Sequence, residues 1–230
     1  MFIMRRINLI LVLIAFLLSA CNSDQVKVRG KVEGLNGPVK LMAEMPGGPG
    51  LTILAEQEVK DGNIDLRTDS LKIPARVCVD IDGKRTLEII LDTKDMIWIK
   101  GKIKFPTEIE ANGSGLMDEY ENIKKQFKEK YEEPIKELEA KNEKIANSKK
   151  KSKDYEMLMG VNQLRIQRYL KMRANWAKAL IEANPGKEVS LFILKDELVD
   201  SLDAQKALFK KMMIENKESN IYKVLEDKLK

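Results

Sequence analysis

The chain of 230 residues contains no histidine. Histidine is the commonest general base at neutral pH and a ligand in nearly every catalytic zinc site. Its absence therefore excludes Ser-His-Asp and Cys-His catalysis. Carboxylates or lysine could still support catalysis, but the sequence favours a protein that is not an enzyme and that uses no cofactor or metal.

Cysteine is scarce as well, with Cys21 and Cys78 as the whole complement. There is no Cys-x-x-Cys pair for thiol chemistry, and an internal disulfide is not expected. Cys78 lies in the apolar run 75–79, so we expect a small buried hydrophobic side chain rather than a reactive thiol.

The charge imbalance is small. Lys and Arg number 41 and Asp and Glu 36, which gives a formal net charge of +5. Removal of residues 1–20, which carry Arg5 and Arg6 and no acidic residue, lowers the net charge to +3. No basic motif is concentrated enough to indicate nucleic-acid binding, and the N-terminal segment indicates export from the cytoplasm.

That N-terminal segment has the parts of an export signal. The two arginines are followed by an apolar run over 7–18, and the segment ends with Leu18-Ser19-Ala20-Cys21. The run is shorter than the roughly 20 apolar residues that a spanning helix needs. A cysteine directly after small residues is typical of a lipobox, in which the thiol receives a diacylglyceryl group before cleavage. An uncleaved membrane anchor and an ordinary cysteine in a signal peptide are the alternatives.

We therefore expect residues 1–20 to be a lipoprotein signal peptide, Cys21 to be lipidated and 21–25 to be a short polar tether. Each lipid methylene buried in a bilayer contributes about 0.8 kcal/mol, so several acyl chains on one cysteine give a stable anchor. The membrane is thus one expected partner, and the expected location is the outer membrane on its periplasmic side.

Residues 26–109 alternate apolar and polar side chains, with turn residues at close spacing. This period-two pattern predicts half-buried strands. The dipeptides Asn36-Gly37, Asp61-Gly62 and Asp82-Gly83 favour tight hairpin turns. We predict an antiparallel β-sandwich or half-open barrel over 26–115.

From residue 116 the apolar period becomes helical. Two long stripes, over 120–145 and 155–180, are joined by a polar lysine-rich turn. They predict an antiparallel helical hairpin, with Pro134 as a kink or a break between two helices. The predicted fold class is therefore α+β, with a helical domain over 116–230.

Shorter closing helices are expected near the C-terminus. They are predicted over 203–214 and 221–229, with Ser201 and Ser219 as N-caps. The apolar run 189–194 is expected to lie in the core.

Several stretches resemble a known module: Val28-Arg29-Gly30-Lys31-Val32-Glu33-Gly34-Leu35, Val59-Lys60-Asp61-Gly62-Asn63 and Gly113-Ser114-Gly115. They resemble the β-rich domain of unknown function that precedes the thioredoxin-like domain in lipoprotein thiol–disulfide oxidoreductases of Gram-negative bacteria. The helical part resembles the spacer that follows it, with Asn184-Pro185 and Ser190-Leu191-Phe192 at the turn into a short helix. The resemblance covers about residues 26–225 and implies fold and compartment. A Trp-Cys-x-x-Cys site is absent, so no catalytic residue is carried over.

Three groups of residues could form a site, and each has a simpler structural interpretation. Asp80, Asp82, Asp92 and Asp95 could bind calcium, but their positions favour two turns. Methionines at helical spacing (Met157, Met159, Met172, Met212 and Met213) and the tryptophans Trp98 and Trp176 are more typical of core, although a tryptophan on a sandwich face can form a ligand platform.

The third group is a lysine cluster at the tip of the predicted hairpin, formed by Lys149, Lys150, Lys151 and Lys153. A contact with an acidic partner or with acidic lipid headgroups is one interpretation, and a solvated turn is the other.

Together these observations lead to two hypotheses of function. The first is a lipid-anchored envelope protein that is not an enzyme and whose helical hairpin contacts a protein partner. The second is an accessory to envelope thiol–disulfide chemistry without its own catalytic domain, and this hypothesis rests on the resemblance.

Overall fold

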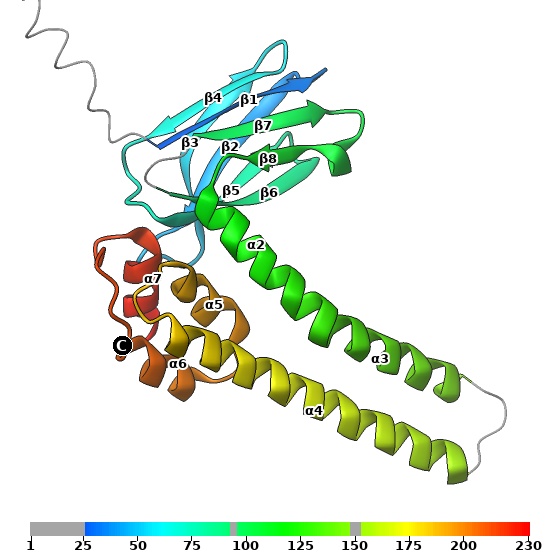
Figure 1. Cartoon of the computed structure of the whole chain (residues 1–230). Coiled ribbons are helices and arrows are strands. Elements are labelled where there is room, and N and C mark those ends of the chain that lie inside the picture. Colours follow the sequence, from blue (N-terminus) through cyan, green and yellow to red (C-terminus); the bar gives the residue numbers. More distant parts are fainter. Residues whose placement is uncertain (1–25, 93–95, 148–152) are drawn as a thin grey trace, which may run out of the picture.

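The computed structural model describes residues 26–92, 96–147 and 153–230. Its N-terminal part holds eight strands in two four-stranded sheets (Figure 1). The strands are β1 Val26–Glu33, β2 Gly37–Glu44, β3 Leu51–Val59, β4 Asn63–Thr68, β5 Ala75–Ile81, β6 Arg85–Leu91, β7 Ile97–Lys102 and β8 Glu110–Asn112, with a single 3-10 turn, η1, at Pro106–Glu108.

One sheet has the order β4-β1-β7-β8, and we call it sheet one. The other, sheet two, has the order β3-β2-β5-β6. The strands form two open layers and no closed barrel, so the α+β class and the sandwich form of the prediction are confirmed. One strand pair departs from the expected antiparallel arrangement, because β1 and β7 are parallel. Between these two strands the chain enters sheet two twice, for β2–β3 and for β5–β6, and it returns to sheet one at β4 and again at β7.

Two of the three expected hairpin turns instead connect the two sheets. The first links β1 to β2, and its left-handed residue is Gly34, with φ of +77°, rather than Gly37. The second, Asp61-Gly62, links β3 to β4, which also lie in different sheets. Hydrogen bonds between the backbones of these two turns hold them together, with Gly62 N donating to Leu35 O at 3.0 Å. Among the described residues, Asp82-Gly83 joins neighbouring strands, β5 and β6, as predicted.

The sandwich core follows from the alternation in the sequence. The inward-facing side chains of β1, β2, β5 and β7 are valine, leucine, isoleucine or alanine and are almost fully buried, and glycine occupies the remaining inward positions. The outward positions are polar with few exceptions. Cys78 is one of these outward positions on β5 and is half-buried, so the expectation of a core cysteine is wrong. The period of two places Val77 and Val79 inside and turns Cys78 outward.

The helical part begins with one long bent helix. It consists of α2 Gly115–Phe127, a π-helical turn η2 Lys128–Glu132, and α3 Glu133–Ala146. Ser114 caps it by accepting a hydrogen bond from Met117 N at 3.2 Å. Pro134 lies in the first turn of α3, directly after the π-helical turn, so the chain bends there without a break.

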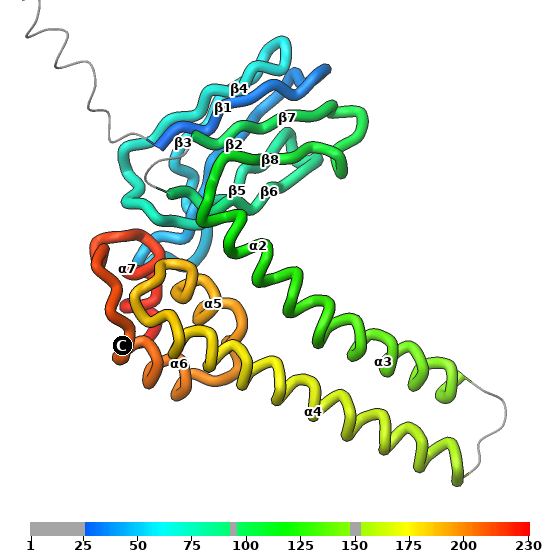
Figure 2. Tube along the Cα trace, in the orientation of Figure 1, coloured from blue at the N-terminus to red at the C-terminus, as the bar shows by residue number. Residues whose placement is uncertain are grey.

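The helix α4 Lys153–Ala183 returns alongside and completes the predicted hairpin, which projects away from the sandwich (Figure 2). With 31 residues and a rise of about 1.5 Å per residue, α4 is roughly 45 Å long. An aromatic cluster of Phe127, Tyr131 and Trp176 packs at the base of the hairpin, and a small apolar cluster with Leu138 and Ile166 packs farther along it.

Three shorter helices complete the chain: α5 Val189–Glu197, α6 Leu202–Phe209 and α7 Asn220–Lys228. The apolar run of α5 is buried as predicted. The helix expected over 203–214 ends at Phe209, because the chain then turns back against Pro185, whose carbonyl accepts a hydrogen bond from Met213 N. Ser219 caps α7 through Tyr222 N, whereas the side chain of Ser201 forms no capping bond to α6. Within the described part of the chain, no helix has both the length and the apolar character that crossing a bilayer requires.

Candidate functional site

The structure describes only one of the five residues that the sequence singled out as contact or lipidation sites. Cys21, Lys149, Lys150 and Lys151 lie outside the described residues. Lys153 begins α4 and is exposed, at the end of the hairpin farthest from the sandwich.

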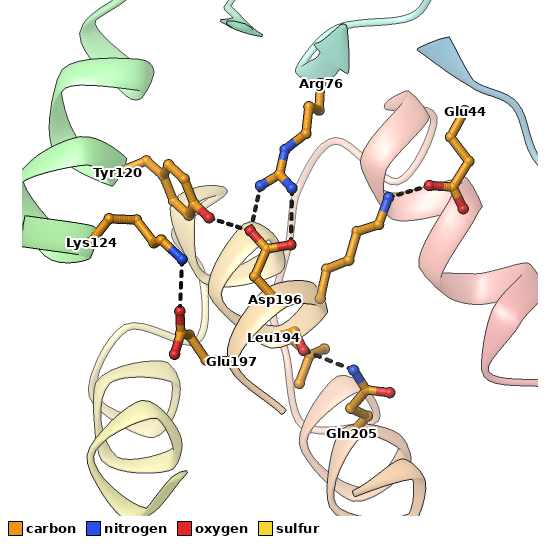
Figure 3. Close-up of polar contacts among 9 residues, drawn as sticks. Glu44, Arg76, Tyr120, Lys124, Leu194, Asp196, Glu197 and Gln205 are labelled. Atoms are coloured by element: carbon orange, nitrogen blue, oxygen red, sulfur yellow. Dashed lines mark hydrogen bonds and ion pairs between the residues drawn. The ribbon is translucent and has the colours of Figure 1, made fainter. Parts of the chain in front are cut away.

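The base of the hairpin is fixed to the sandwich by a cluster of charged side chains, which we call the ionic junction (Figure 3). Arg76 of β5 donates two hydrogen bonds to the Asp196 carboxylate of α5, at 2.9 and 2.5 Å. The Tyr120 hydroxyl of α2 donates to the same carboxylate. The Arg76 guanidinium also lies over the rings of Tyr120 and Phe192, 5.3 and 5.5 Å from their centroids. One arginine therefore links the sandwich to two helices.

A second carboxylate continues the junction toward α4. The Glu197 side chain is only 1% exposed and accepts from Lys124 of α2 at 3.1 Å and from Arg173 of α4 at 2.6 Å. Arg173 also contacts Glu132 at 3.1 Å. Lys195 of α5 forms an ion pair with Glu44 at the end of β2, which adds another contact between the helices and the sandwich. The charges at the base of the hairpin are thus neutralised within the protein.

The pKa shifts at the junction have the direction expected for paired groups. Burial alone would raise the pKa of Asp196, but hydrogen bonds and charge from Arg76 outweigh it, so the pKa lies below the ordinary value of an aspartate. Burial and the Asp196 charge both raise the pKa of Tyr120. The hydrogen bond to Glu197 is the main reason why the pKa of Arg173 is raised. These groups stay in one protonation state near neutral pH, which fits a structural role rather than proton transfer.

Farther along the hairpin a groove of about 470 Å³ runs between α3 and α4. We call it the hairpin groove. Its walls are formed by Pro134, Glu137, Leu138 and Lys141 of α3 and by Arg165, Arg168, Tyr169 and Met172 of α4. Three cations and one carboxylate therefore surround a floor of aliphatic, aromatic and thioether groups.

The cations of the groove differ from those of the ionic junction in their pairing. Among the residues that the structure describes, Lys141, Arg165 and Arg168 form no ion pair. All three are exposed. An acidic ligand would thus meet cations that need not give up an internal partner.

Beside the groove, α4 presents apolar side chains to solvent. Met157, Val161, Leu164 and Met172 fall at steps that place them along one side of the helix, and Leu164 is 73% exposed. We call these four residues the α4 ridge. The expectation that Met157 and Met172 belong to the core is therefore wrong, because the opposite side of α4, with Asn162 and Ile166, packs against α3. Met213 is also exposed, whereas Met159 and Met212 are half-buried.

The calcium hypothesis has no support in the described aspartates. Asp82 forms an ion pair with Lys84 at 2.6 Å and lies in the β5–β6 turn. Asp80 accepts from Thr86 across the same strand pair, and Asp95 lies outside the described residues. Within residues 26–92, 96–147 and 153–230, no three His, Cys, Asp or Glu side chains converge as a metal site.

The two tryptophans differ in environment. Trp176 packs against Phe127, with ring centroids 4.3 Å apart, as a core residue should. Trp98 is 50% exposed on the outer surface of sheet one, so its assignment to the core is wrong. Its even-numbered position on β7 points away from Ile97 and Ile99, which are buried.

No known protein family, curated protein or solved structure matches this chain. The resemblance to the module of lipoprotein thiol–disulfide oxidoreductases therefore stays a prediction.

One signal in the sequence could have located the groove. Residues 157–181 carry five cations, Arg165, Arg168, Lys171, Arg173 and Lys178, and no carboxylate. In a chain in which acidic and basic residues are otherwise mixed, such a run on one helix indicates a surface with unbalanced charge.

Proposed function

We propose that this protein is a lipid-anchored envelope protein that is not an enzyme and whose helical hairpin docks an acidic protein partner. The sandwich and the ionic junction act as a rigid base, and the hairpin carries the contact surface away from that base. The anchor is the lipidated Cys21, and the location is the outer membrane on its periplasmic side.

The observation that carries the proposal is the contrast between the two ends of the hairpin. At the base the charged groups pair with one another and are half-buried or buried. Along the groove the cations are exposed and unpaired within the described residues, next to exposed apolar side chains of α4. Interface cores combine exposed apolar groups with arginine and aromatic side chains in this manner.

The groove and ridge also define the kind of partner. An amphipathic helix can lie in a groove between two helices, with apolar residues at steps of three and four. Lys141, Arg165 and Arg168 favour carboxylates on the flanks of that helix, because arginine binds carboxylates with two parallel hydrogen bonds. The expected partner surface is therefore an acidic amphipathic helix, and Lys149, Lys150, Lys151 and Lys153 would extend the same preference to the tip.

A pull-down from native membranes, with crosslinking and mass spectrometry, tests this function. The full chain is compared with a groove variant, Lys141→Gln, Arg165→Gln and Arg168→Gln, and with a control variant, Lys60→Gln, Lys72→Gln and Lys210→Gln. Both variants lose three exposed cations, so they have the same net charge and differ only in where the cations are removed. We expect the same partner with the native and control chains, crosslinks within 133–178, and loss of the partner with the groove variant.

Equal capture by the groove and control variants would refute the groove as the contact surface. If the captured protein is a thiol–disulfide oxidoreductase, the accessory function in envelope redox chemistry becomes the specific form of the proposal. Turnover of an envelope substrate by the purified protein alone would contradict the proposal as a whole.

The anchor is tested separately. Cys21→Ser removes the thiol that would accept the lipid, so we expect the protein to leave the membrane fraction or to remain unprocessed with a larger mass. Fractionation and mass spectrometry measure both outcomes. Unchanged fractionation together with unchanged mass would rule out lipidation at Cys21.

A further inference from the structure

The outer surface of sheet one is a separate feature that the hairpin function does not use. The strand pairing places twelve side chains on it, since paired residues share a face. They are Lys27, Arg29, Lys31 and Glu33 of β1, Asn63, Asp65 and Arg67 of β4, Trp98, Lys100 and Lys102 of β7, and Glu110 and Asn112 of β8. We call this surface the basic face. The helices gather at one end of the sandwich and leave it open (Figure 1).

The basic face carries six cations and three carboxylates. The outer surface of sheet two has the opposite balance. Outside the ionic junction it carries the cation Lys40 and the four carboxylates Glu56, Glu58, Asp80 and Glu88. The sandwich is therefore polarised from one face to the other, and a flat anionic surface would attract it in one orientation.

Carboxylates on the basic face do not cancel its charge. Asp65 forms ion pairs with both Arg29 and Arg67, and the two arginines give the pKa of this carboxyl a value of about 2. Lys102 pairs with Glu33 at 2.9 Å and Lys100 with Glu110 at 3.6 Å, but Lys27 and Lys31 form no ion pair among the described residues. Cations thus remain available to negative groups from outside.

Trp98 lies within this face, with Arg29 beside it on β1. Half of its surface is exposed to solvent. Tryptophan combines a large apolar ring with one polar N–H group, and it is enriched where proteins meet the headgroup layer of a bilayer. A tryptophan among lysine and arginine side chains therefore fits an anionic lipid surface.

Only a short stretch of sequence separates the expected anchor from β1. Cys21 and Val26 are separated by five residue steps, which span at most about 18 Å when fully extended. Lys27 is the first outward residue of β1, and Arg29 lies about 10 Å beyond Val26 along the strand. A lipid on Cys21 would therefore keep the sandwich close enough to the bilayer for the basic face to contact the headgroups.

We propose that the basic face lies against anionic phospholipid headgroups, with Trp98 in the headgroup layer, so that the protein has a defined orientation on the membrane. This inference rests on the proposed lipid anchor and adds an orientation to it. In that orientation the acidic outer surface of sheet two points away from the bilayer, and the sandwich cannot rotate freely on its tether.

Tryptophan quenching by lipid tests the orientation. The full chain is reconstituted in vesicles of phosphatidylethanolamine and phosphatidylglycerol that contain a lipid with a quencher near the headgroup. We expect quenching of part of the fluorescence and no quenching in Trp98→Phe, which keeps Trp176 on the hairpin. Vesicles without phosphatidylglycerol should show much weaker quenching.

A variant with fewer cations tests whether electrostatic attraction, and not only the nearness imposed by the anchor, brings the basic face to the lipid. Arg29→Gln, Lys31→Gln and Lys100→Gln together should weaken the attraction of the face for anionic lipid about 100-fold and abolish the quenching. The control variant Lys60→Gln, Lys72→Gln and Lys210→Gln should be quenched like the native chain. Vesicle flotation shows independently whether each protein is anchored.

The outcomes distinguish the orientation from the anchor. A protein that floats with the vesicles but has an unquenched Trp98 overturns the orientation and leaves the anchor intact. A protein that does not float indicates failure of the anchor. Shielding of Trp98 by a soluble acidic polysaccharide, without quenching by lipid, would assign the face to a glycan instead and would also overturn the inference.

Discussion

Asp196→Asn should weaken both halves of the molecule at once. The Asp196 carboxylate accepts two hydrogen bonds from Arg76 and one from Tyr120, which come from β5 and α2. Asparagine keeps the size of the side chain but removes the negative charge. The Arg76 guanidinium would then be left in a mostly enclosed site without its counter-charge.

The expected loss in the free energy of unfolding follows from the burial of the Arg76–Asp196 pair. The side chains of Arg76 and Asp196 are only 19% and 17% exposed, so water could compensate for little of the lost interaction between them. Removing one partner of a fully buried pair costs about 3–5 kcal/mol, and a hydrogen bond to a charged group contributes about 1.5–3 kcal/mol. Because the pair is not fully buried and asparagine can still accept a hydrogen bond, we expect a loss of about 3 kcal/mol.

Urea unfolding of the purified protein measures this loss. With a slope of about 2–3 kcal/mol per molar urea for a chain of this size, the midpoint should fall by roughly 1 M. Trp98 lies in the sandwich and Trp176 in α4, so Trp98→Phe and Trp176→Phe backgrounds report on each half separately. Both reporters should show the shift if the junction couples the two halves.

Two further variants test whether burial of the Arg76–Asp196 pair causes the loss. Asp65→Asn breaks exposed ion pairs on sheet one and should cost less than about 1 kcal/mol. Arg76→Met combined with Asp196→Leu removes both charges and should recover much of the loss. A cost for Asp196→Asn no larger than that for Asp65→Asn would show that solvent screens the junction, and the account of the junction would then be wrong.

Two other predictions concern pH and a turn. The folded pKa of Asp196 lies below its ordinary value of about 4, so the stabilisation from its carboxylate is complete above that ordinary value and is lost as the pH falls through the folded pKa. In urea unfolding, the native chain should therefore be more stable than Asp196→Asn at pH 7, and this difference should shrink as the pH is lowered through the acid range. Gly62→Ala should lower the free energy of unfolding by more than about 2 kcal/mol, because φ is +75° and the added Cβ would lie 2.2 Å from a backbone carbonyl oxygen. Gly83→Ala has a similar φ of +65° but open space around the added Cβ, so it should lower the free energy of unfolding by only about 1 kcal/mol. Thermal or urea unfolding measures both values, and equal losses would refute the clash at Gly62.

Local periodicity accounts for much of the agreement between sequence and structure. The alternation in β1, β2 and β5 and the helical stripes over 120–145 and 155–180 each reflect burial of one face, and a face can be recognised from a single segment. The same logic failed for Met172 and Met157, since an apolar side chain at helical spacing can lie on an unpartnered side of the helix.

The local sequence of a turn does not reveal whether the turn joins adjacent strands or two different sheets. Asp61-Gly62 and Asp82-Gly83 have similar residues and left-handed backbone angles, yet one connects two sheets and the other joins adjacent strands. The choice depends on strand pairing: β4 pairs with β1 and β5 pairs with β2, and in both pairs the partners are separated by other strands along the chain. The parallel pair of β1 and β7 has the same cause.

The candidate surfaces depend on contacts between distant segments as well. The ionic junction joins Arg76 to Asp196 across 120 residues of sequence, and no spacing rule links them. The hairpin groove was partly accessible to sequence reasoning, because the unbalanced charge of 157–181 can be counted. Trp98 could have been placed outside from the alternation of β7, in which its neighbours Ile97 and Ile99 are both apolar.

The most direct test of the central claim is the comparison of native, groove-variant and control chains in crosslinking pull-downs from native membranes. The account predicts one acidic partner that is crosslinked to α3 and α4 of the native and control chains and is lost from the chain with Lys141→Gln, Arg165→Gln and Arg168→Gln. Undiminished recovery of that partner by the groove variant, or crosslinks confined to the sandwich, would contradict it.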